Sequence, residues 1–285
     1  MNGNWVLITG ASRGLGLHLV NRFWNSGWNV ALVARDSVAL SKVGASLPRR
    51  PNQSTMVFAC DFTDPNAVDQ LICELKAHLP RLDALINNAA VHGPIGPLLG
   101  NSMDKWSDAI QVNLLAPVAL CHGLIDLMAR FGGGSIINLS GGGATGPREN
   151  FTAYASSKVA LVRFSESLAL EVGSQHIRVN CISPGAMKTA LLEEVVSCGV
   201  DVSGEREFLV AQNTLAGGGA SMDRVADLAL FLTGDTGSAI SGKLISAIWD
   251  NWILWPQHSY ELKMSDAYTL RRIAGRERGM DWGDV

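Results

Sequence analysis

A tyrosine and a lysine four residues apart are the side chains in this sequence best suited to carry out chemistry. Tyr154 and Lys158 lie in the segment 151–160, and in a helix this spacing puts both side chains on one face. An ammonium group close to a phenol favours the phenolate, so Lys158 is expected to lower the pKa of Tyr154. Such a tyrosine can exchange a proton with a substrate oxygen as a general acid–base catalyst. The same spacing also occurs where a core aromatic residue neighbours a solvated cation, so the interpretation depends on the rest of the chain.

A glycine-rich turn near the N-terminus has the context of a phosphate-binding site. The apolar run Asn4–Thr9 predicts a strand, and a helical pattern that stops at Gly27 follows the turn. Glycines allow the backbone to approach a pyrophosphate closely, and the helix N-terminus offers unpaired N–H groups and a positive dipole. The predicted cofactor-binding residues in this turn are Gly10, Ser12, Arg13, Gly14, Leu15 and Gly16.

The end of the second predicted strand, Asn29–Ala34, indicates which dinucleotide is bound. In a dinucleotide fold this strand end meets the adenosine ribose, where an acidic side chain holds the 2′-hydroxyl of NAD. Here Arg35 occupies the position, and together with Arg13 it favours the 2′-phosphate of NADP through charge-assisted hydrogen bonds. Asp36 follows directly and could weaken that preference. The sequence therefore predicts NADP, with NAD as the alternative.

Further candidate residues follow the ends of other predicted strands. Open α/β sheets bind ligands at the edge where the carboxyl ends of parallel strands meet. Asp61, after the strand Thr55–Ala59, is expected to accept a hydrogen bond from an adenine amino group. The remaining candidates at strand ends are Phe62, Asn87, Asn88, Ala89, Ala90, Ser140, Pro184 and Gly185.

Seven predicted strands alternate with helical patterns along the chain. Their ranges are 4–9, 29–34, 55–59, 82–86, 135–139, 176–182 and 243–248. This alternation predicts an α/β fold with a single doubly wound, Rossmann-type parallel sheet of seven strands and helices on both faces. The absence of an internal repeat or a linker indicates one domain over residues 1–248.

Two regions break the regular pattern. The helical region Met103–Arg130 contains Asn113 and Pro117, which are unfavourable inside a helix, so Asn113 is expected to sit at a kink and hold a freed carbonyl or a water. Residues 190–220 are poorly periodic and end in three glycines, a composition typical of a mobile flap.

Composition and charge exclude several classes of protein. With 17% charged residues and a net charge of −3, the chain has no footprint for nucleic acid. We found no signal peptide, no apolar run long enough to span a bilayer and no metal-ligand spacing. The five cysteines form no C-x-x-C pair and are odd in number, which predicts reduced, packed thiols and a cytoplasmic location.

Over roughly residues 4–248 the sequence resembles the short-chain dehydrogenase/reductase family. The resemblance lies in five features in this order: the glycine turn, Asn87-Asn-Ala89, Asn113, the Tyr154–Lys158 pair and Pro184-Gly185. The resemblance implies that Tyr154 is the general acid/base, that Lys158 lowers its pKa and binds the nicotinamide ribose, and that Asn113 holds a water in a proton relay. It further implies that Pro184 and Gly185 line the nicotinamide, that Thr189 binds its carboxamide, and that Asp61 and 87–90 flank the adenosine. Members of the family are commonly dimers or tetramers, so a homodimer or homotetramer is expected.

The sequence departs from the family pattern at the catalytic serine, which in the family lies thirteen residues before the tyrosine. That position is Gly141, whereas Ser140 lies fourteen residues before Tyr154. The glycine run 141–143 could let the loop shift so that Ser140 fills the role, or Thr145 or a water could substitute for it. A milder departure is Ala90, where the family often has glycine.

The C-terminal extension, residues 249–285, is longer than is usual in the family. It contains Trp249, Trp252 and Trp255, which are expected to pack on the same domain or on a neighbouring subunit. The alternative is a lid over the substrate, with Asp250 or Trp252 as contacts. His92, in the loop after the fourth strand, lies near the expected mouth of the pocket and is expected to be a solvated loop residue, with substrate contact as the alternative.

We therefore predict an NADP-dependent oxidoreductase that interconverts a carbonyl and a secondary alcohol on a small organic substrate. Tyr154, Lys158, Asn113 and Ser140 are its predicted catalytic residues. The alternatives are an NADP(H)-binding sensor or assembly subunit with little turnover, and a dehydratase or epimerase of the same family.

Overall fold

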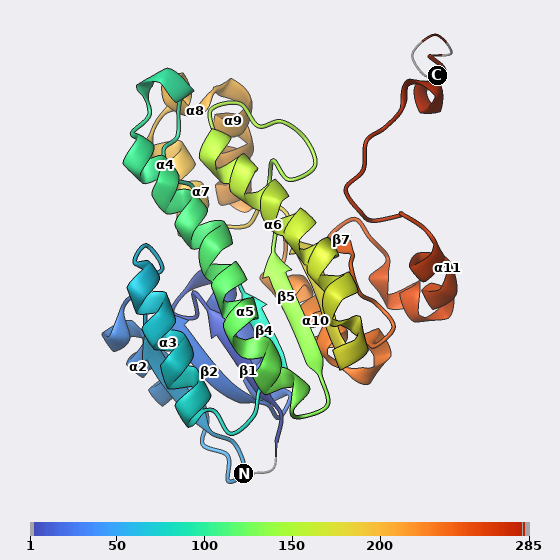
Figure 1. Cartoon of the computed structure of the whole chain (residues 1–285). Coiled ribbons are helices and arrows are strands. Elements are labelled where there is room, and N and C mark those ends of the chain that lie inside the picture. Colours follow the sequence, from blue (N-terminus) through green and yellow to red (C-terminus); the bar gives the residue numbers. More distant parts are fainter. Residues whose placement is uncertain (1–2, 281, 283–285) are drawn as a thin grey trace.

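A seven-stranded, all-parallel sheet in the order β3-β2-β1-β4-β5-β6-β7 forms the centre of the molecule (Figure 1). The computed structural model describes residues 3–280 and 282. The strands are β1 (Trp5–Thr9), β2 (Asn29–Ala34), β3 (Thr55–Ala59), β4 (Ala84–Asn87), β5 (Gly134–Leu139), β6 (Ile177–Ser183) and β7 (Leu244–Ser246). Each lies within two residues of its predicted bounds, which confirms the doubly wound fold.

Helices cover both faces of this sheet because alternate strand residues point to opposite sides. On one face Val6 and Ile8 of β1 belong to a core shared with α1 (Gly14–Asn25), α2 (Ser37–Ser46) and α10 (Met222–Thr233). On the other face Trp5 and Leu7 belong to a core shared with α3 (Pro65–His78), α5 (Ala116–Ala129) and α6 (Thr152–Val172). The Asp64 carboxylate caps α3 by accepting a hydrogen bond from the backbone N–H of Asn66.

The long helical region before β5 consists of three joined parts. They are α4 (Met103–Ile110), a π-helical turn (Gln111–Leu115) and α5. Its span Met103–Ala129 is long and apolar enough to cross a membrane by length and composition, contrary to our expectation of no such run. Its most apolar window is 56% buried, and α5 packs in the core beside α3, as a core helix does. The composition of the segment does not show this burial, because burial depends on the helices and strands that pack against it.

The segment predicted as an irregular flap is largely helical. It forms α7 (Ala190–Ser197), α8 (Val200–Ser203), α9 (Glu205–Asn213) and a π-helical turn (Thr214–Gly218). These short helices lie together with α4 beyond the end toward which β5 points (Figure 1). Their stability comes from packing on each other and on the domain, which the weak periodicity of the segment does not reveal. We refer to residues 190–218 as the flap.

The C-terminal extension packs beside the edge strand β7. It contains a 3₁₀ segment (Trp252–His258), α11 (Ser259–Met264) and a second 3₁₀ turn (Gly275–Arg278). Trp252 is buried against Phe231 of α10, with ring centroids 5.1 Å apart, and Trp255 is buried against Tyr268 at 4.3 Å. Trp249, by contrast, is 86% exposed. The last part of this extension, residues 281 and 283–285, lies outside the described residues.

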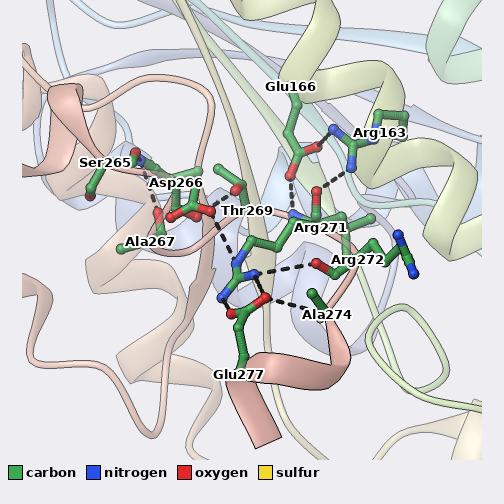
Figure 2. Close-up of polar contacts among 12 residues, drawn as sticks. Arg163, Glu166, Ser265, Asp266, Ala267, Thr269, Arg271, Arg272, Ala274 and Glu277 are labelled. Atoms are coloured by element: carbon green, nitrogen blue, oxygen red, sulfur yellow. Dashed lines mark hydrogen bonds and ion pairs between the residues drawn. The ribbon is translucent and has the colours of Figure 1, made fainter. Parts of the chain in front are cut away.

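Polar contacts fasten the extension to α6 and to the start of β7 (Figure 2). The backbone N–H of Leu244 donates to the carbonyl of Tyr268 at 2.8 Å, so the extension pairs with the sheet edge. Lys243 Nζ donates to the carbonyls of Ser265 and Ala267, and Glu166 of α6 accepts from the backbone N–H of Leu270. Asp250 accepts from the N–H of Ser246 at 2.7 Å, which places this carboxylate in a turn after β7.

Candidate active site

Tyr154 and Lys158 lie one turn apart on the inner face of α6 and are both buried. Tyr154 is 8% exposed and Lys158 is 2% exposed. Lys158 Nζ lies 5.7 Å from the centre of the Tyr154 ring and donates a hydrogen bond to the carbonyl of Leu139, the last residue of β5, at 2.8 Å. The pair therefore sits at the carboxyl edge of the sheet, where the strand-end candidates gather.

Burial dominates the ionisation of both groups. It raises the pKa of Tyr154, and the cation that acts against this shift is Arg148. Burial also lowers the pKa of Lys158 to about 8. The direction for Tyr154 is opposite to the one that the Tyr–Lys spacing predicts, because the spacing does not report how completely the phenol is removed from water.

The glycine run after β5 determines what stands beside the tyrosine hydroxyl. A Cβ on Gly141 would lie 2.3 Å from Tyr154 Oη, so Gly141 is the residue directly against this hydroxyl. The neighbouring Ser140 is 3% exposed, and its Oγ has no hydrogen-bond partner among the described residues. A buried hydroxyl without a partner is costly, which is consistent with a ligand oxygen as its partner. Thr145, the alternative donor, is exposed.

Asn113 lies in the π-helical turn, where a kink is expected. Its side chain exchanges two hydrogen bonds with the backbone of Val91: Oδ1 accepts from the N–H at 2.9 Å, and Nδ2 donates to the carbonyl at 2.8 Å. Nδ2 also donates to Ser157 Oγ of α6 at 3.0 Å. Asn113 thus joins the loop after β4 to the helix that carries Tyr154.

His92 and Arg148 lie next to Tyr154, although the sequence did not identify either as a site residue. His92 is 4% exposed and meets Tyr154 edge to face with ring centroids 5.0 Å apart, so the prediction of a solvated loop residue is wrong. The Arg148 guanidinium lies 3.8 Å from the ring centre of Phe151 and 5.6 Å from that of Tyr154. The available signal for Arg148 was its place between the glycine run and the catalytic helix, which fixes no contact by itself.

The glycine turn after β1 is closely packed by main-chain atoms. A Cβ on Gly16 would lie 2.0 Å from the carbonyl oxygen of Gly10. Thr9 Oγ1 accepts from the N–H groups of Asn88 and Ala89 at 2.9 and 3.0 Å, and Asn88 Nδ2 donates to the Thr9 carbonyl at 2.8 Å. These bonds bring the turn and the end of β4 together, as the prediction of one cofactor site requires.

The turn fits a dinucleotide cofactor. Helix α1 has no acidic residue in its first turn, and Arg13 at its N-cap makes no capping side-chain bond, so the positive end of the helix remains open to an anion. Thr189, the N-cap residue of α7, lies next to the turn, with its methyl group 3.8 Å from the Cβ position of Gly14. Leu15 is buried in the core, so its backbone alone faces the turn.

The other predicted cofactor residues lie at neighbouring strand ends. Arg13 and Arg35 are exposed, whereas the Asp36 carboxylate accepts from the N–H of Ala39 and caps α2. Asp61 Oδ1 accepts two bonds from Thr63 and stabilises its own turn. Phe62 is buried in the core, Pro184 is buried, Gly185 is exposed, and Asn87 donates to Asn138 of β5 at 2.8 Å.

The cysteine thiols are not paired with one another. Cys60, Cys121 and Cys181 are buried, and burial raises the pKa of Cys121 and of Cys181 to about 12, which keeps these thiols protonated. Cys73 is exposed, which is an exception to the prediction of packed thiols. Within residues 3–280 and 282, no group of three or more His, Cys, Asp or Glu side chains could hold a metal ion.

Comparisons with known proteins agree with this arrangement. The model of the short chain dehydrogenase family matches residues 4–198. A fatty acyl-CoA reductase of Acinetobacter baylyi is 35% identical over 67% of this chain, and the match spans 65% of that protein's length. A D-threitol dehydrogenase of Mycolicibacterium smegmatis is 30% identical over 85% of this chain and 90% of its own.

Solved structures give the same result. L-sorbose reductase from Gluconobacter frateurii, complexed with NADPH and L-sorbose, is 28% identical with a TM-score of 0.76, covering 86% of this chain and 95% of its own. A xylitol dehydrogenase with NAD⁺ bound is 26% identical with the same TM-score, covering 86% and 97%. The chain therefore belongs to the short-chain dehydrogenase/reductase family of oxidoreductases.

Proposed function

We propose that the protein is an NADP-dependent oxidoreductase that interconverts a carbonyl and a secondary alcohol on a small organic substrate. The observation that carries the proposal is the buried Tyr154–Lys158 pair at the carboxyl end of β5, on the same sheet edge as the open N-terminus of α1. When bound, the nicotinamide group donates or accepts the hydride. The relatives named as reductases and dehydrogenases support the reaction class.

The residues of the chain bind, orient and supply a proton. Tyr154 is the proton donor and acceptor for the substrate oxygen. Because burial raises its pKa, it is a phenol at neutral pH, which suits protonation of a carbonyl oxygen during reduction. Lys158 holds the end of β5 through its bond to the Leu139 carbonyl, and its remaining N–H groups would bind the cofactor ribose. Asn113 fixes the loop after β4 against α6, and Ser140 offers its buried hydroxyl to a ligand oxygen.

The preference for NADP rests on charge at the end of β2. Arg13 and Arg35 provide exposed guanidinium groups for a 2′-phosphate, while Asp36 uses one oxygen to cap α2. Asp61, Asn88 and Ala89 would flank the adenosine. Pro184, Gly185 and Thr189 would lie on the nicotinamide side. We propose a cytoplasmic homodimer or homotetramer, and light scattering of the purified protein measures that state.

The proposal is tested by following NADPH absorbance with a panel of small ketones. Tyr154→Phe is expected to lower kcat by about 10²–10⁴, the usual contribution of a general acid, while NADPH binding persists. Tyr260→Phe is the matched control, since Tyr260 is 72% exposed on α11. Full activity of Tyr154→Phe would contradict the proposal.

A second candidate is an NADP(H)-binding sensor or assembly subunit with little turnover. It is favoured by Gly141, which places no hydroxyl against Tyr154 Oη where the family has its catalytic serine. Tight NADPH binding by wild-type protein without reduction of any ketone would support this candidate. A measurable kcat that is lost in Tyr154→Phe would exclude it.

A further inference from the structure

Two polar side chains form the wall of the site around Tyr154. The His92 ring meets the Tyr154 ring edge to face at 5.0 Å, and the Arg148 guanidinium lies 5.6 Å from the centre of the same ring. They come from different loops, after β4 and after β5. Both also contact Phe151, which is fully buried, at 5.5 and 3.8 Å. The Tyr154 ring is therefore flanked by polar nitrogen groups as well as by apolar ones.

Each of these side chains forms an ion pair with the flap. Arg148 donates through Nε to Glu207 of α9 at 2.9 Å, with Nη2 at 2.8 Å from the same oxygen. His92 Nδ1 lies 3.2 Å from Glu194 of α7. The side chains of Arg148 and Glu207 are 13% and 22% exposed, so this pair is largely shielded from water. The flap carboxylates fix both side chains in place, and Glu207 compensates the charge of Arg148.

One edge of the guanidinium remains directed at the glycine run. Nε and Nη2 of Arg148 face Glu207, whereas Nη1 lies 3.6 Å from the Cβ position of Gly142. The preceding residue, Gly141, is the one whose Cβ would meet Tyr154 Oη. The free edge of the guanidinium therefore lies beside the glycine run that adjoins the tyrosine hydroxyl.

The polar groups and charges around His92 and Arg148 determine which chemical group of a substrate could bind next to them. An alkyl substituent would bury N–H donors without a partner, which is unfavourable. A carboxylate would meet the negative charges of Glu194 and Glu207 close behind the donors. A neutral hydroxyl or carbonyl oxygen accepts an N–H bond and adds no charge, so it fits both conditions.

We propose that Arg148 and His92 are specificity-determining residues that bind hydroxyl oxygens of a small polyhydroxylated ketone, or of the matching polyol, next to the reacting carbon. This inference rests on the proposed oxidoreductase function. It assigns Arg148 the donor role nearest to the glycine run, and it makes Glu207 the residue that keeps the pocket selective for neutral oxygens over carboxylates.

The experiment compares three ketones of similar size with NADPH: erythrulose, butan-2-one and 2-oxobutanoate. Wild-type protein should have its highest kcat/KM with erythrulose. Arg148→Met, which keeps the length of the side chain and removes its donors, should lower kcat/KM for erythrulose by about 10–100-fold and for butan-2-one by less than about threefold. Arg163→Met is the matched control, because Arg163 forms its ion pair with Glu166 on α6, more than two turns beyond Tyr154.

Two further variants keep the inference falsifiable if Arg148→Met folds poorly. His92→Phe preserves a ring against Tyr154 and removes the nitrogens, so it should also penalise erythrulose selectively. Glu207→Gln keeps an oxygen acceptor for Arg148 and removes the negative charge, so it should raise the relative kcat/KM for 2-oxobutanoate.

The outcomes separate the two proposals. A wild-type preference for butan-2-one or 2-oxobutanoate, or an equal loss on all ketones in Arg148→Met, would overturn the specificity inference and leave the oxidoreductase intact. No reduction of any ketone by wild-type protein, with NADPH bound, would instead overturn the oxidoreductase function and the inference with it.

Discussion

The cofactor side and the substrate side of the site are built in different ways. On the cofactor side the shape is set by main-chain atoms: Gly16 lies against the carbonyl of Gly10, and Asn88 is bonded to the backbone of Thr9. On the substrate side the shape is set by side-chain pairs that join distant segments, such as Arg148 with Glu207. Main-chain packing tolerates little change, whereas side-chain pairs can be exchanged, so one side can stay constant while the other selects a substrate.

The largest expected effect comes from breaking the main-chain side. Gly16→Ala would place a Cβ 2.0 Å from the carbonyl oxygen of Gly10, so the turn must move. We expect NADPH affinity to fall by at least about 100-fold, because close backbone approach holds the pyrophosphate. Titration of tryptophan fluorescence measures it. Gly146→Ala is the control, since nothing lies within 4 Å of its Cβ position, and equal affinity in both variants would refute the main-chain account.

A smaller effect is expected from the substrate side. Gly141→Ala would bring a methyl group to within 2.3 Å of Tyr154 Oη and displace the hydroxyl. A displacement of this size should lower kcat/KM by about 10–100-fold, while NADPH binding stays unchanged. Gly146→Ala serves as control, because nothing lies within 4 Å of its Cβ position. If both variants reduced ketones equally well, Gly141 would not adjoin the reacting hydroxyl.

Arg35 tests whether the cofactor side also uses side chains. Arg35→Ala removes an exposed guanidinium at the end of β2. We expect the Kd for NADPH to rise by about tenfold and that for NADH to change little, because a charge-assisted bond to the 2′-phosphate is lost. Calorimetry with both cofactors provides the comparison. A parallel loss of both would assign Arg35 to the fold rather than to the phosphate.

The smallest effect is a pH dependence of stability from Lys158. Burial lowers the pKa of Lys158 in the folded protein to about 8, below its ordinary value of 10.5. Between pH 8 and pH 10.5 Lys158 is protonated in the unfolded chain but largely deprotonated in the folded protein. The folded protein therefore bears the full cost of burying the ammonium below pH 8, and this cost falls as pH rises toward 10.5. As pH rises from 7 to 9, this linkage is expected to raise the free energy of unfolding by about 1 kcal/mol.

Urea unfolding of wild-type protein and Lys158→Met measures that contribution. The stability advantage of the methionine variant should shrink as pH rises from 7 to 9. The comparison between the two proteins cancels the titration of groups that do not interact with Lys158, such as Cys121, whose pKa burial raises to about 12. A constant difference across this range would show that Lys158 keeps its ordinary pKa.

The sheet and the glycine turn could be predicted because their signals are local. Runs such as Trp5–Thr9 and Asn29–Ala34 are buried throughout and apolar except for one terminal residue each, and strand, turn and helix follow each other without interruption. The kink at Asn113 was predictable for the same reason, since an asparagine and a proline disturb a helix from within. Its bond partner, the backbone of Val91, lies 22 residues away and was not predictable.

The substrate side was predicted poorly because its contacts are long-range. His92 was expected in solvent and is buried, since Glu194, 102 residues away, and Tyr154 cover it. The flap was expected to be irregular and forms three α-helices, because packing on neighbouring segments compensates its weak periodicity. For a polar residue in a loop, its spacing in the sequence shows neither whether the side chain is buried nor which residue it contacts.

The sequence alone determined which segments are strands and where glycines allow a tight turn of the backbone. It also determined that Tyr154 and Lys158 share a helix face. Covalent spacing and helix geometry are sufficient for each of these. The tertiary structure decided how far Tyr154 is removed from water, which cation opposes the rise of its pKa, and which carboxylates hold His92 and Arg148. Those properties depend on the distances between segments far apart in the chain, and such distances exist only after the chain has folded.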